Sequence, residues 1–255
     1  MKISNQNNNI TFKHKKIGTV NLLKLKNGEK TGIEKALISI FEDNNTEDAK
    51  IIGKLQELWT QYCYKLPPRE ALLSKTLTED ICNNFISLNV VNNLDKKALQ
   101  AYSPSPPVKR VFLAIEKEGE DVLEKRVLGL MNITEEETIP KRLKLNFLVV
   151  NPLLISKNIK REIAGIGETL FTKIVQIAEK KGYRDISWSS ENNSFYLDLL
   201  KKRKIDSDKV HVGGVSFVLP QRFFNSFLDY FDGKYKMNFS SAPIEKELSY
   251  FDVSA

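Results

Sequence analysis

The chain has 255 residues, of which 41% are hydrophobic and 28% are charged, the balance of an ordinary soluble globular protein. With only two cysteines and two histidines, it excludes a disulfide framework and a cysteine- or histidine-rich metal site. We therefore expect no metal cofactor. No apolar run approaches the roughly 20 residues that a membrane span needs, so we also expect no membrane segment.

The formal net charge of +7 is compatible with a nucleic acid, an anionic membrane surface or a phosphorylated ligand. The basic residues are interspersed with 32 acidic ones, which favours the simpler interpretation that lysines keep the surface soluble. We therefore do not expect nucleic-acid binding. The first nine residues are polar and Asn-rich and lack the basic-then-apolar pattern of a signal peptide, which predicts a cytoplasmic protein.

The N-terminal part begins with a predicted strand over residues 17–25, which ends in a turn at Asn27-Gly28. Residues 32–94 then have a helical pattern. It is clearest in residues 49–62, where apolar side chains recur at spacings of three and four and predict one core-facing helix. Pro67-Pro68 ends that helix, and a further helix is predicted over residues 78–85. Residues 103–107 read Ser-Pro-Ser-Pro-Pro and predict an extended connector.

After the connector, residues 111–115 and 127–133 predict a β-hairpin. A third strand over residues 143–150 ends in an apolar run, which predicts burial on both faces. The elements predicted after it are a helix over 166–181 capped by Gly182, a strand over 185–190, a helix over 193–204, a strand over 211–219, and an amphipathic stripe over 223–231. The stripe is compatible with packing on the domain, a lid or a homodimer contact.

The informative segment lies between the third strand and the long helix. A basic loop over residues 157–161 is followed by Gly165-Ile166-Gly167 and the helix start. A phosphate needs free backbone N–H groups, the positive end of a helix dipole and close approach without a β-carbon, and this segment offers all three. A tight turn alone would also explain the glycines. The triphosphate-binding loop is absent, and Leu170 replaces the third glycine of the dinucleotide fingerprint.

Together these motifs resemble the GNAT acyltransferase superfamily. In that family a β-hairpin leads to a central strand ending in hydrophobic-x-Pro, here Val150-Asn151-Pro152, and a basic loop with a glycine turn opens a long helix. A later helix begins with an aromatic pair, here Phe195-Tyr196. The resemblance implies an α/β fold with a mixed, mostly antiparallel twisted sheet flanked by helices, splayed where acyl-CoA enters, and a helix-rich N-terminal portion.

The resemblance also favours one domain over two. We expect a disordered N-terminus over residues 1–10 and a single domain over residues 11–232. That domain would contain a helical insertion at about residues 32–100 and the acyl-CoA-binding core at about residues 108–220. Residues 233–255 would form a C-terminal tail.

The activity that the resemblance implies is direct transfer of an acetyl or other short acyl group from acetyl-CoA, or another acyl-CoA, to an amine acceptor. Leu148, Val149 and Val150 would pair with the pantetheine arm and hold the thioester oxygen. Asn192 and Asn193 would bond the pantetheine amides. The residues expected to cradle the pyrophosphate are Arg161, Ala164, Gly165, Ile166, Gly167, Glu168 and Thr169.

The expected catalytic residues are Tyr196, as the acid that protonates the leaving thiolate, and Glu191, as the base. A tyrosine at a helix start is also explained by packing. Glu116 and Glu135 are further candidate bases. For all three glutamates a solvated surface carboxylate is the simpler interpretation, and ordered water is another route for the proton. Glu162 replaces the Gln or Arg of the family's loop, and the central strand contains no acid.

These departures leave two alternatives open. One is a catalytically inactive CoA-binding or interaction module, and the other is a nucleic-acid-binding protein that uses its basic surface.

Overall fold

The computed structural model describes residues 15–92, 110–136, 140–155, 162–190 and 192–235. The expected disordered N-terminus and most of the expected C-terminal tail lie outside these residues, as do the connector and the basic loop.

The N-terminal hairpin joins β1 (Lys15–Lys26) to β2 (Glu29–Phe41) in antiparallel pairing. Asn27 and Gly28 have φ angles of 53° and 86°, as a tight two-residue hairpin turn requires, so the predicted strand and turn are confirmed. The helical pattern predicted from residue 32 is wrong as far as Phe41, because this stretch is β2. Its last six residues are all buried within the sheet, and a short continuous apolar run does not distinguish a strand from a helix.

Two helices follow the hairpin. α1 (Thr46–Cys63) begins after Asn45, whose side chain accepts hydrogen bonds from the amides of Glu47 and Asp48 at 2.9 Å and 3.4 Å. α2 (Pro68–Asn92) begins at the second proline of the pair, a residue whose fixed φ suits a first helical turn. Both predicted helices are confirmed, and both pack onto the sheet through an aromatic group that includes Trp59, Phe85 and Phe112.

The middle of the chain forms the predicted hairpin, third strand and long helix. Its elements in chain order are β3 (Arg110–Lys117), α4 (Leu123–Arg126), β4 (Val127–Glu136), β5 (Arg142–Val150), the 3-10 turn Pro152–Leu154, β6 (Ile163–Ala164) and α5 (Ile166–Lys181). Gly182 caps α5 with a φ of 67°, as predicted.

The last elements are β7 (Asp185–Ser189), α6 (Asn193–Lys202), the 3-10 turn Ser207–Lys209, β8 (His211–Gly213), β9 (Ser216–Pro220), the 3-10 turn Gln221–Phe223 and α7 (Phe224–Tyr235). The single strand predicted over residues 211–219 is wrong. Gly213 and Gly214 both have positive φ angles, and they turn the chain so that β8 and β9 pair antiparallel.

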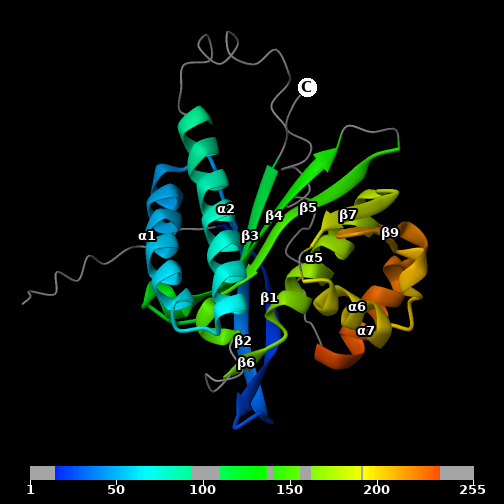
Figure 1. The fold of residues 1–255 in the computed structure, drawn as a ribbon, viewed down its shortest axis with the longest axis horizontal. Coiled ribbons are helices and arrows are strands. Elements are labelled where there is room, and N and C mark those ends of the chain that lie inside the picture. The colour runs from blue at the N-terminus through cyan, green and yellow to red at the C-terminus, as the bar shows by residue number, and fades with distance from the viewer. Residues whose placement is uncertain (1–14, 93–109, 137–139, 156–161, 191, 236–255) are drawn as a thin grey trace, which may run out of the picture.

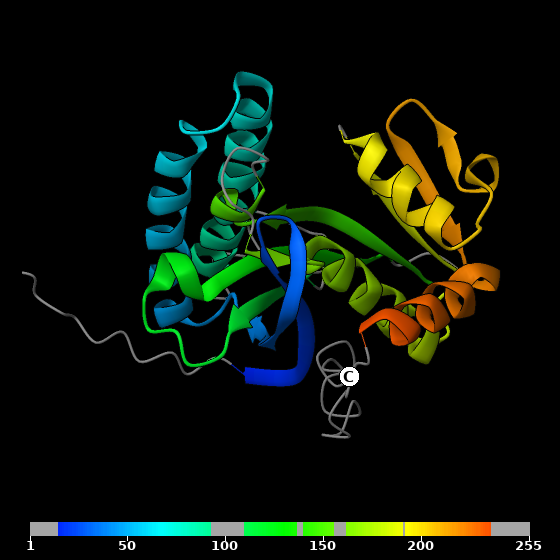
Figure 2. The ribbon, with the colours of Figure 1, turned by 90° about the horizontal axis from the view of Figure 1, so that it is seen from below.

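All nine described strands join one sheet in the order β6-β1-β2-β3-β4-β5-β7-β9-β8. Only the pairing of β5 with β7 is parallel, so the predicted mixed, mostly antiparallel sheet is confirmed. α1 and α2 lie over one face, and α5 and α7 lie over the other (Figures 1 and 2). Among the described residues, no helix is both long enough and apolar enough to cross a membrane.

Candidate functional site

The sheet opens between β5 and β7. Their parallel pairing covers only four residue pairs and ends at Leu145 and Trp188. From there to Val150, the described part of β5 pairs with β4 alone. Burial on both faces is therefore a wrong prediction for the end of this strand: Phe147, Leu148 and Val150 are only half-buried, because β7 has left their side. The result is a strand edge with apolar side chains at the place where the sheet splays.

Ion pairs hold β5 and β7 together at the closed end of this opening. Asp185 of β7 accepts hydrogen bonds from Arg142, its partner on β5, at both carboxylate oxygens, one of them 3.2 Å from Nη2. Arg184 donates to the same carboxylate at 2.7 Å. Hydrogen bonding to Asp185 raises the pKa of Arg142. Paired, bidentate contacts of this kind are geometrically specific, so they fix where the strands join and where they part.

The N-terminus of α5 faces the same region. Gly165 precedes the helix with a φ of 94°, a left-handed conformation that favours glycine, and it offers no side-chain cap to the first-turn amides. Ala164 is held in place by pairing with Leu23 of β1. The hydroxyl of Thr169 is buried and has no hydrogen-bond partner among the described residues. The helix therefore begins without a side-chain cap from Gly165 and with a buried hydroxyl that has no partner among the described residues.

Three elements converge at Gly167. A β-carbon there would lie 3.1 Å from Phe195 of α6 and 3.5 Å from Cγ2 of Val150 on β5. The first turn of α5, the open end of β5 and the start of α6 are therefore in contact. The structure thus brings the aromatic pair Phe195-Tyr196 to the strand end and the glycine turn, which come earlier in the sequence.

Gly129 of β4 is a positioning residue that the sequence analysis missed. It pairs with Val150, and a β-carbon on it would lie 2.8 Å from Cγ2 of Ile166 and 3.1 Å from the backbone oxygen of Val149. A larger residue would push α5 away from the end of β5. The available signal was a lone glycine inside a strand pattern, which often marks close approach by another segment.

Glu168 forms a buried ion pair. Its carboxylate accepts a hydrogen bond from Arg203 at 2.8 Å, and the side chains are 8% and 0% exposed. The guanidinium also donates to the carbonyl oxygen of Leu199 and lies over the rings of Phe227 and Tyr230, at 3.9 Å and 4.6 Å from their centroids. The Glu168 side chain therefore ties α5 to α6 and α7, whereas its backbone amide belongs to the uncapped first turn.

Asn192 and Asn193 lie at the start of α6. Asn192 accepts a hydrogen bond from the hydroxyl of Ser194 at 2.8 Å. Asn193 donates to the carbonyl oxygen of Gly214 at 3.3 Å, and its own side-chain oxygen is buried with no partner among the described residues. Asn193 thus keeps one acceptor for another group.

Tyr196 belongs to a cluster of aromatic rings. It lies 4.9 to 5.9 Å from the ring centroids of Phe171, Trp188, Phe195 and Phe217, and only 7% of it is exposed. Burial raises the pKa of its phenol, so the hydroxyl keeps its proton. The packing interpretation and the acid interpretation are therefore both compatible with its position.

The candidate strand acids lie on β3 and β4 and not on β5. Glu116 is 1% exposed, accepts a hydrogen bond from Ser39 at 2.9 Å and pairs with Arg126 at 3.5 Å. Glu135 lies opposite Leu143 near the closed end of the sheet and pairs with Lys141 at 2.7 Å. Arg161 and Glu191, the other charged residues expected at the site, lie outside the described residues.

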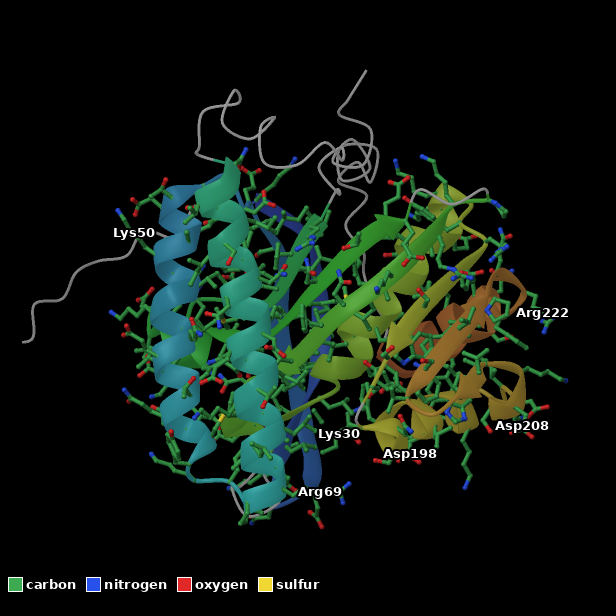
Figure 3. All side chains as sticks on the ribbon, turned by 45° about the horizontal axis from the view of Figure 1, so that its top comes forward. Lys30, Lys50, Arg69, Asp198, Asp208 and Arg222 are labelled. Carbon is green, nitrogen blue, oxygen red and sulfur yellow. The ribbon has the colours of Figure 1, made fainter. Side chains whose placement is uncertain are left out.

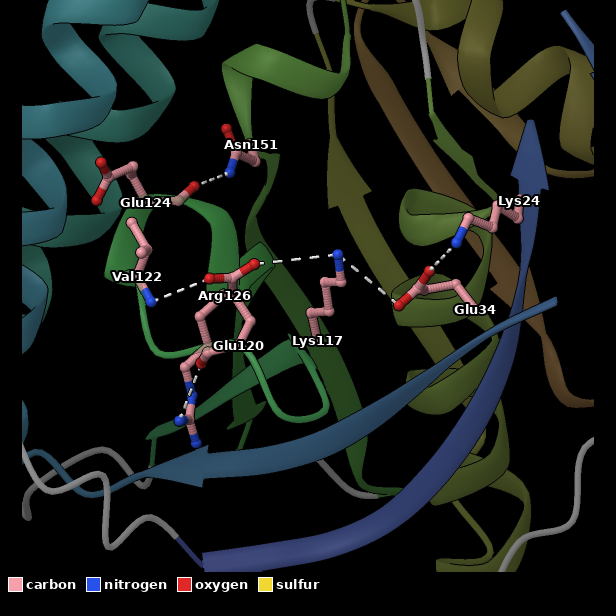
Figure 4. Close-up of polar contacts among 8 residues, drawn as sticks. All are labelled: Lys24, Glu34, Lys117, Glu120, Val122, Glu124, Arg126 and Asn151. Carbon is pink, nitrogen blue, oxygen red and sulfur yellow. Dashed lines mark hydrogen bonds and ion pairs between the residues drawn. The ribbon is translucent and has the colours of Figure 1, made fainter. Parts of the chain in front are cut away.

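A polar network supports the end of β5. Asn151 donates to the carbonyl oxygens of Glu124 and Val127 at 2.6 Å and 3.0 Å, which fixes the strand end to α4 and β4 (Figure 4). Beside it, Lys117 pairs with Glu34 and Glu120. Charges in this region therefore neutralise one another.

Three features agree with the family that the sequence resembles: the parting of β5 from β7, the helix that begins directly after a glycine turn, and the order of the elements. The chain has a GNAT-like fold. It matches no protein-family model and no curated protein.

Several solved structures are similar to it. Tetrahymena GCN5 has a TM-score of 0.38 and 15% identity, over 71% of this chain and 93% of that one. The KacTA–DNA complex has a TM-score of 0.36 and 14% identity, over 59% and 86%. A GNAT-family putative acetyltransferase from Desulfovibrio desulfuricans has a TM-score of 0.35 and 12% identity, over 64% and 82%.

Proposed function

We propose that the protein is an acyltransferase that moves an acetyl or other short acyl group from acyl-CoA to an amine. The observation that carries this proposal is the separation of β5 from β7 beside the uncapped N-terminus of α5. An extended arm can add to an open strand edge, and a pyrophosphate can approach a helix N-terminus. Because the two features meet at Gly167, one ligand with both parts can reach both.

The pantetheine arm would lie along residues 148–150. Their backbone groups would pair with it, and an amide of this segment would hold the thioester oxygen as negative charge develops there. Asn192 and Asn193 would bond the arm from α6, where the unpartnered oxygen of Asn193 supports an acceptor role.

The pyrophosphate would lie at the start of α5. Residues 164–169 would surround it, with Arg161 as the nearby cation. The left-handed Gly165 supports close approach of a ligand to the backbone. The unpartnered hydroxyl of Thr169 supports a further hydrogen bond.

In the reaction, acyl-CoA would supply an acyl carbon and a thiolate leaving group. The neutral amine nitrogen attacks that carbon, so a C–N bond forms and the C–S bond breaks. The amine gives its proton to Glu191 or to water, and the thiolate receives one. Tyr196 would be the acid that gives this proton. Burial raises the pKa of its phenol, so the phenol is protonated before the reaction and can donate a hydrogen bond to the sulfur, although it is a weaker acid than an exposed tyrosine.

Calorimetric titration with acetyl-CoA and with free CoA tests this proposal. Gly165→Asp places a carboxylate at the phosphate cradle, and Gly165→Asn imposes a similar backbone change without the charge. We expect micromolar binding to the wild type, weaker binding to the Asn variant and loss of binding to the Asp variant. A folded wild type that binds neither ligand would contradict the proposal, and DNA binding that falls steeply with salt would then be tested.

One alternative is supported by the lack of an acid on β5 (Arg142–Val150). In a CoA-binding module without catalysis, binding would be retained but no acyl group would leave the CoA. Candidate amines are incubated with the protein and acetyl-CoA, and mass spectrometry of the products distinguishes the two functions, because only the enzyme gives acylated amines.

A further inference from the structure

A polar pocket lies on the opposite side of the sheet from α5, where β5 and β7 begin to part. Its volume is about 370 Å³, within the usual range for small-molecule sites. It is formed by α2, β3, β4, β5 and β7, and its polar lining residues are Asn84, Arg110, Asn132, Lys144, Asn146 and Ser189. Leu145, the last β5 residue paired with β7, also lines it, so the pocket adjoins the place where the proposed acyl donor would lie.

The pocket is cationic. Arg110 and Lys144 line it, and no carboxylate is among its described lining residues. The buried and half-buried arginines elsewhere in the described chain each have an acid: Arg126 pairs with Glu116, Arg142 with Asp185 and Arg203 with Glu168.

Arg110 is half-buried too, but among the described residues it donates to the neutral side-chain oxygen of Asn84, at 3.0 Å. A guanidinium in such a place has several N–H donors left, and its charge favours a carboxylate or phosphate. Lys144 adds a second cation without an ion-pair partner in the described chain. The pocket therefore favours an anionic group.

An amide chain fixes a hydrogen-bond acceptor in the same pocket. The buried Asn132 donates to the carbonyl oxygen of Val111 at 3.4 Å, so its side-chain oxygen accepts. Asn146 then donates its Nδ2 to that oxygen at 2.8 Å and to the hydroxyl of Thr134 at 2.6 Å.

Asn146 Oδ1 therefore has no partner among the described residues. Asn146 is also the extra residue where the pairing of β5 with β4 shifts register, and such bulges commonly redirect a side chain next to a site. An N–H donor of a ligand would satisfy this oxygen.

We infer that the acyl acceptor is a small amine that carries an anionic group. Arg110 and Lys144 bind the anion, and Asn146 Oδ1 accepts a hydrogen bond from the amine nitrogen. This inference rests on the proposed acyltransferase function. A carboxylate and a phosphate present the same charge-assisted acceptors to these cations, so the class is defined by the anion.

The test compares amines with matched head groups. Purified full-length protein and acetyl-CoA are incubated with an amino acid, its uncharged amide, the corresponding aminoalkylphosphonate and a diamine, and products are measured by mass spectrometry. We expect kcat/KM for at least one anionic amine to exceed that for the amide and the diamine by at least about tenfold, as one charge-assisted contact would give. The carboxylate and phosphonate arms identify which anion is preferred.

Variants test the assigned residues. Arg110→Gln and Lys144→Gln should each raise KM for the anionic amine at least several-fold and reduce the preference for that amine over the amide. Lys50→Gln makes the same charge change on α1, at the outer surface of the molecule (Figure 3), and should change neither. Lys144 is exposed, so its variant keeps the test valid if Arg110→Gln fails to fold.

The outcomes separate the two proposals. Acetyl-CoA binding with faster transfer to the diamine or the amide would overturn the anionic acceptor and keep the acyltransferase. If CoA binds but no amine is acylated, titration of the same amines into the CoA-saturated protein decides, and equal or no binding of the anionic ones overturns the inference. Failure to bind acetyl-CoA would overturn the acyltransferase proposal and this inference with it.

Discussion

The buried pair between Glu168 and Arg203 gives the sharpest stability prediction. Arg203→Met removes the cation that pairs with the Glu168 carboxylate, which is 8% exposed, and leaves the negative charge buried. Breaking a buried pair from one side typically costs about 3–5 kcal/mol. Loss of the contacts to Phe227 and Tyr230 adds to this, since a guanidinium over a ring contributes about 0.5–2 kcal/mol. We therefore expect the free energy of unfolding to fall by at least about 3 kcal/mol.

Urea denaturation followed by tryptophan fluorescence measures this loss. The double variant Arg203→Met with Glu168→Met removes both charges and should be markedly more stable than Arg203→Met alone. Lys50→Met is the matched control, because it breaks an exposed pair with Glu47 at 2.7 Å and should change little. A loss below about 1 kcal/mol for Arg203→Met, or a double variant no more stable than the single one, would refute the reasoning.

Three further predictions concern the core and the site. Gly129→Ala should cost about 1–3 kcal/mol by urea denaturation and weaken CoA binding, because the new methyl group meets the backbone of β5, whereas Gly32→Ala, with open space around it, should do neither. Tyr196→Phe keeps the ring in the aromatic cluster, so we expect a lower kcat with nearly unchanged acetyl-CoA affinity; an unchanged kcat would leave Tyr196 as a packing residue. Burial raises the pKa of Cys63 to about 11 and of Cys82 to about 12, so the native thiols stay neutral where unfolded ones ionise. The free energy of unfolding should therefore fall as the pH rises from about 9 towards 11, and a Cys82→Ala variant should show a shallower fall.

Local chemistry explains which elements the sequence could predict. Asn27-Gly28 and Gly182 require left-handed backbone, and the structure has it at both places. The spacing in α1 and α5 marks their buried faces. By contrast, the apolar run at the end of β2 has no period to read, and the turn at Gly213-Gly214 is hidden inside an apolar pattern.

The site was predictable where it is contiguous and not where it is assembled. The glycine turn and the strand end lie within one segment of the chain, so their chemistry is visible in the sequence. The half-burial of Phe147, Leu148 and Val150 depends on the direction that β7 takes after Trp188, which is a tertiary property. The cationic pocket draws on side chains from five elements, and only the folded structure shows that Arg110 has the neutral Asn84 and not an acid beside it.

The charges near the acceptor pocket predict how easily the bound amine loses its proton. Glu116 and Glu135 are held by Arg126 and Lys141, whereas the pocket presents Arg110 and Lys144. In solution, an acceptor's own anion stabilises its ammonium form. Binding that anion to two cations cancels this effect, and nearby positive charge lowers the pKa of an amine. A strand carboxylate beside the amine would instead raise the pKa of the amine. The pH profile of kcat should therefore rise with a midpoint below the pKa of the free acceptor, and Lys144→Gln should move it upwards. A midpoint at or above that pKa would show that the cationic pocket does not lower the pKa of the bound amine.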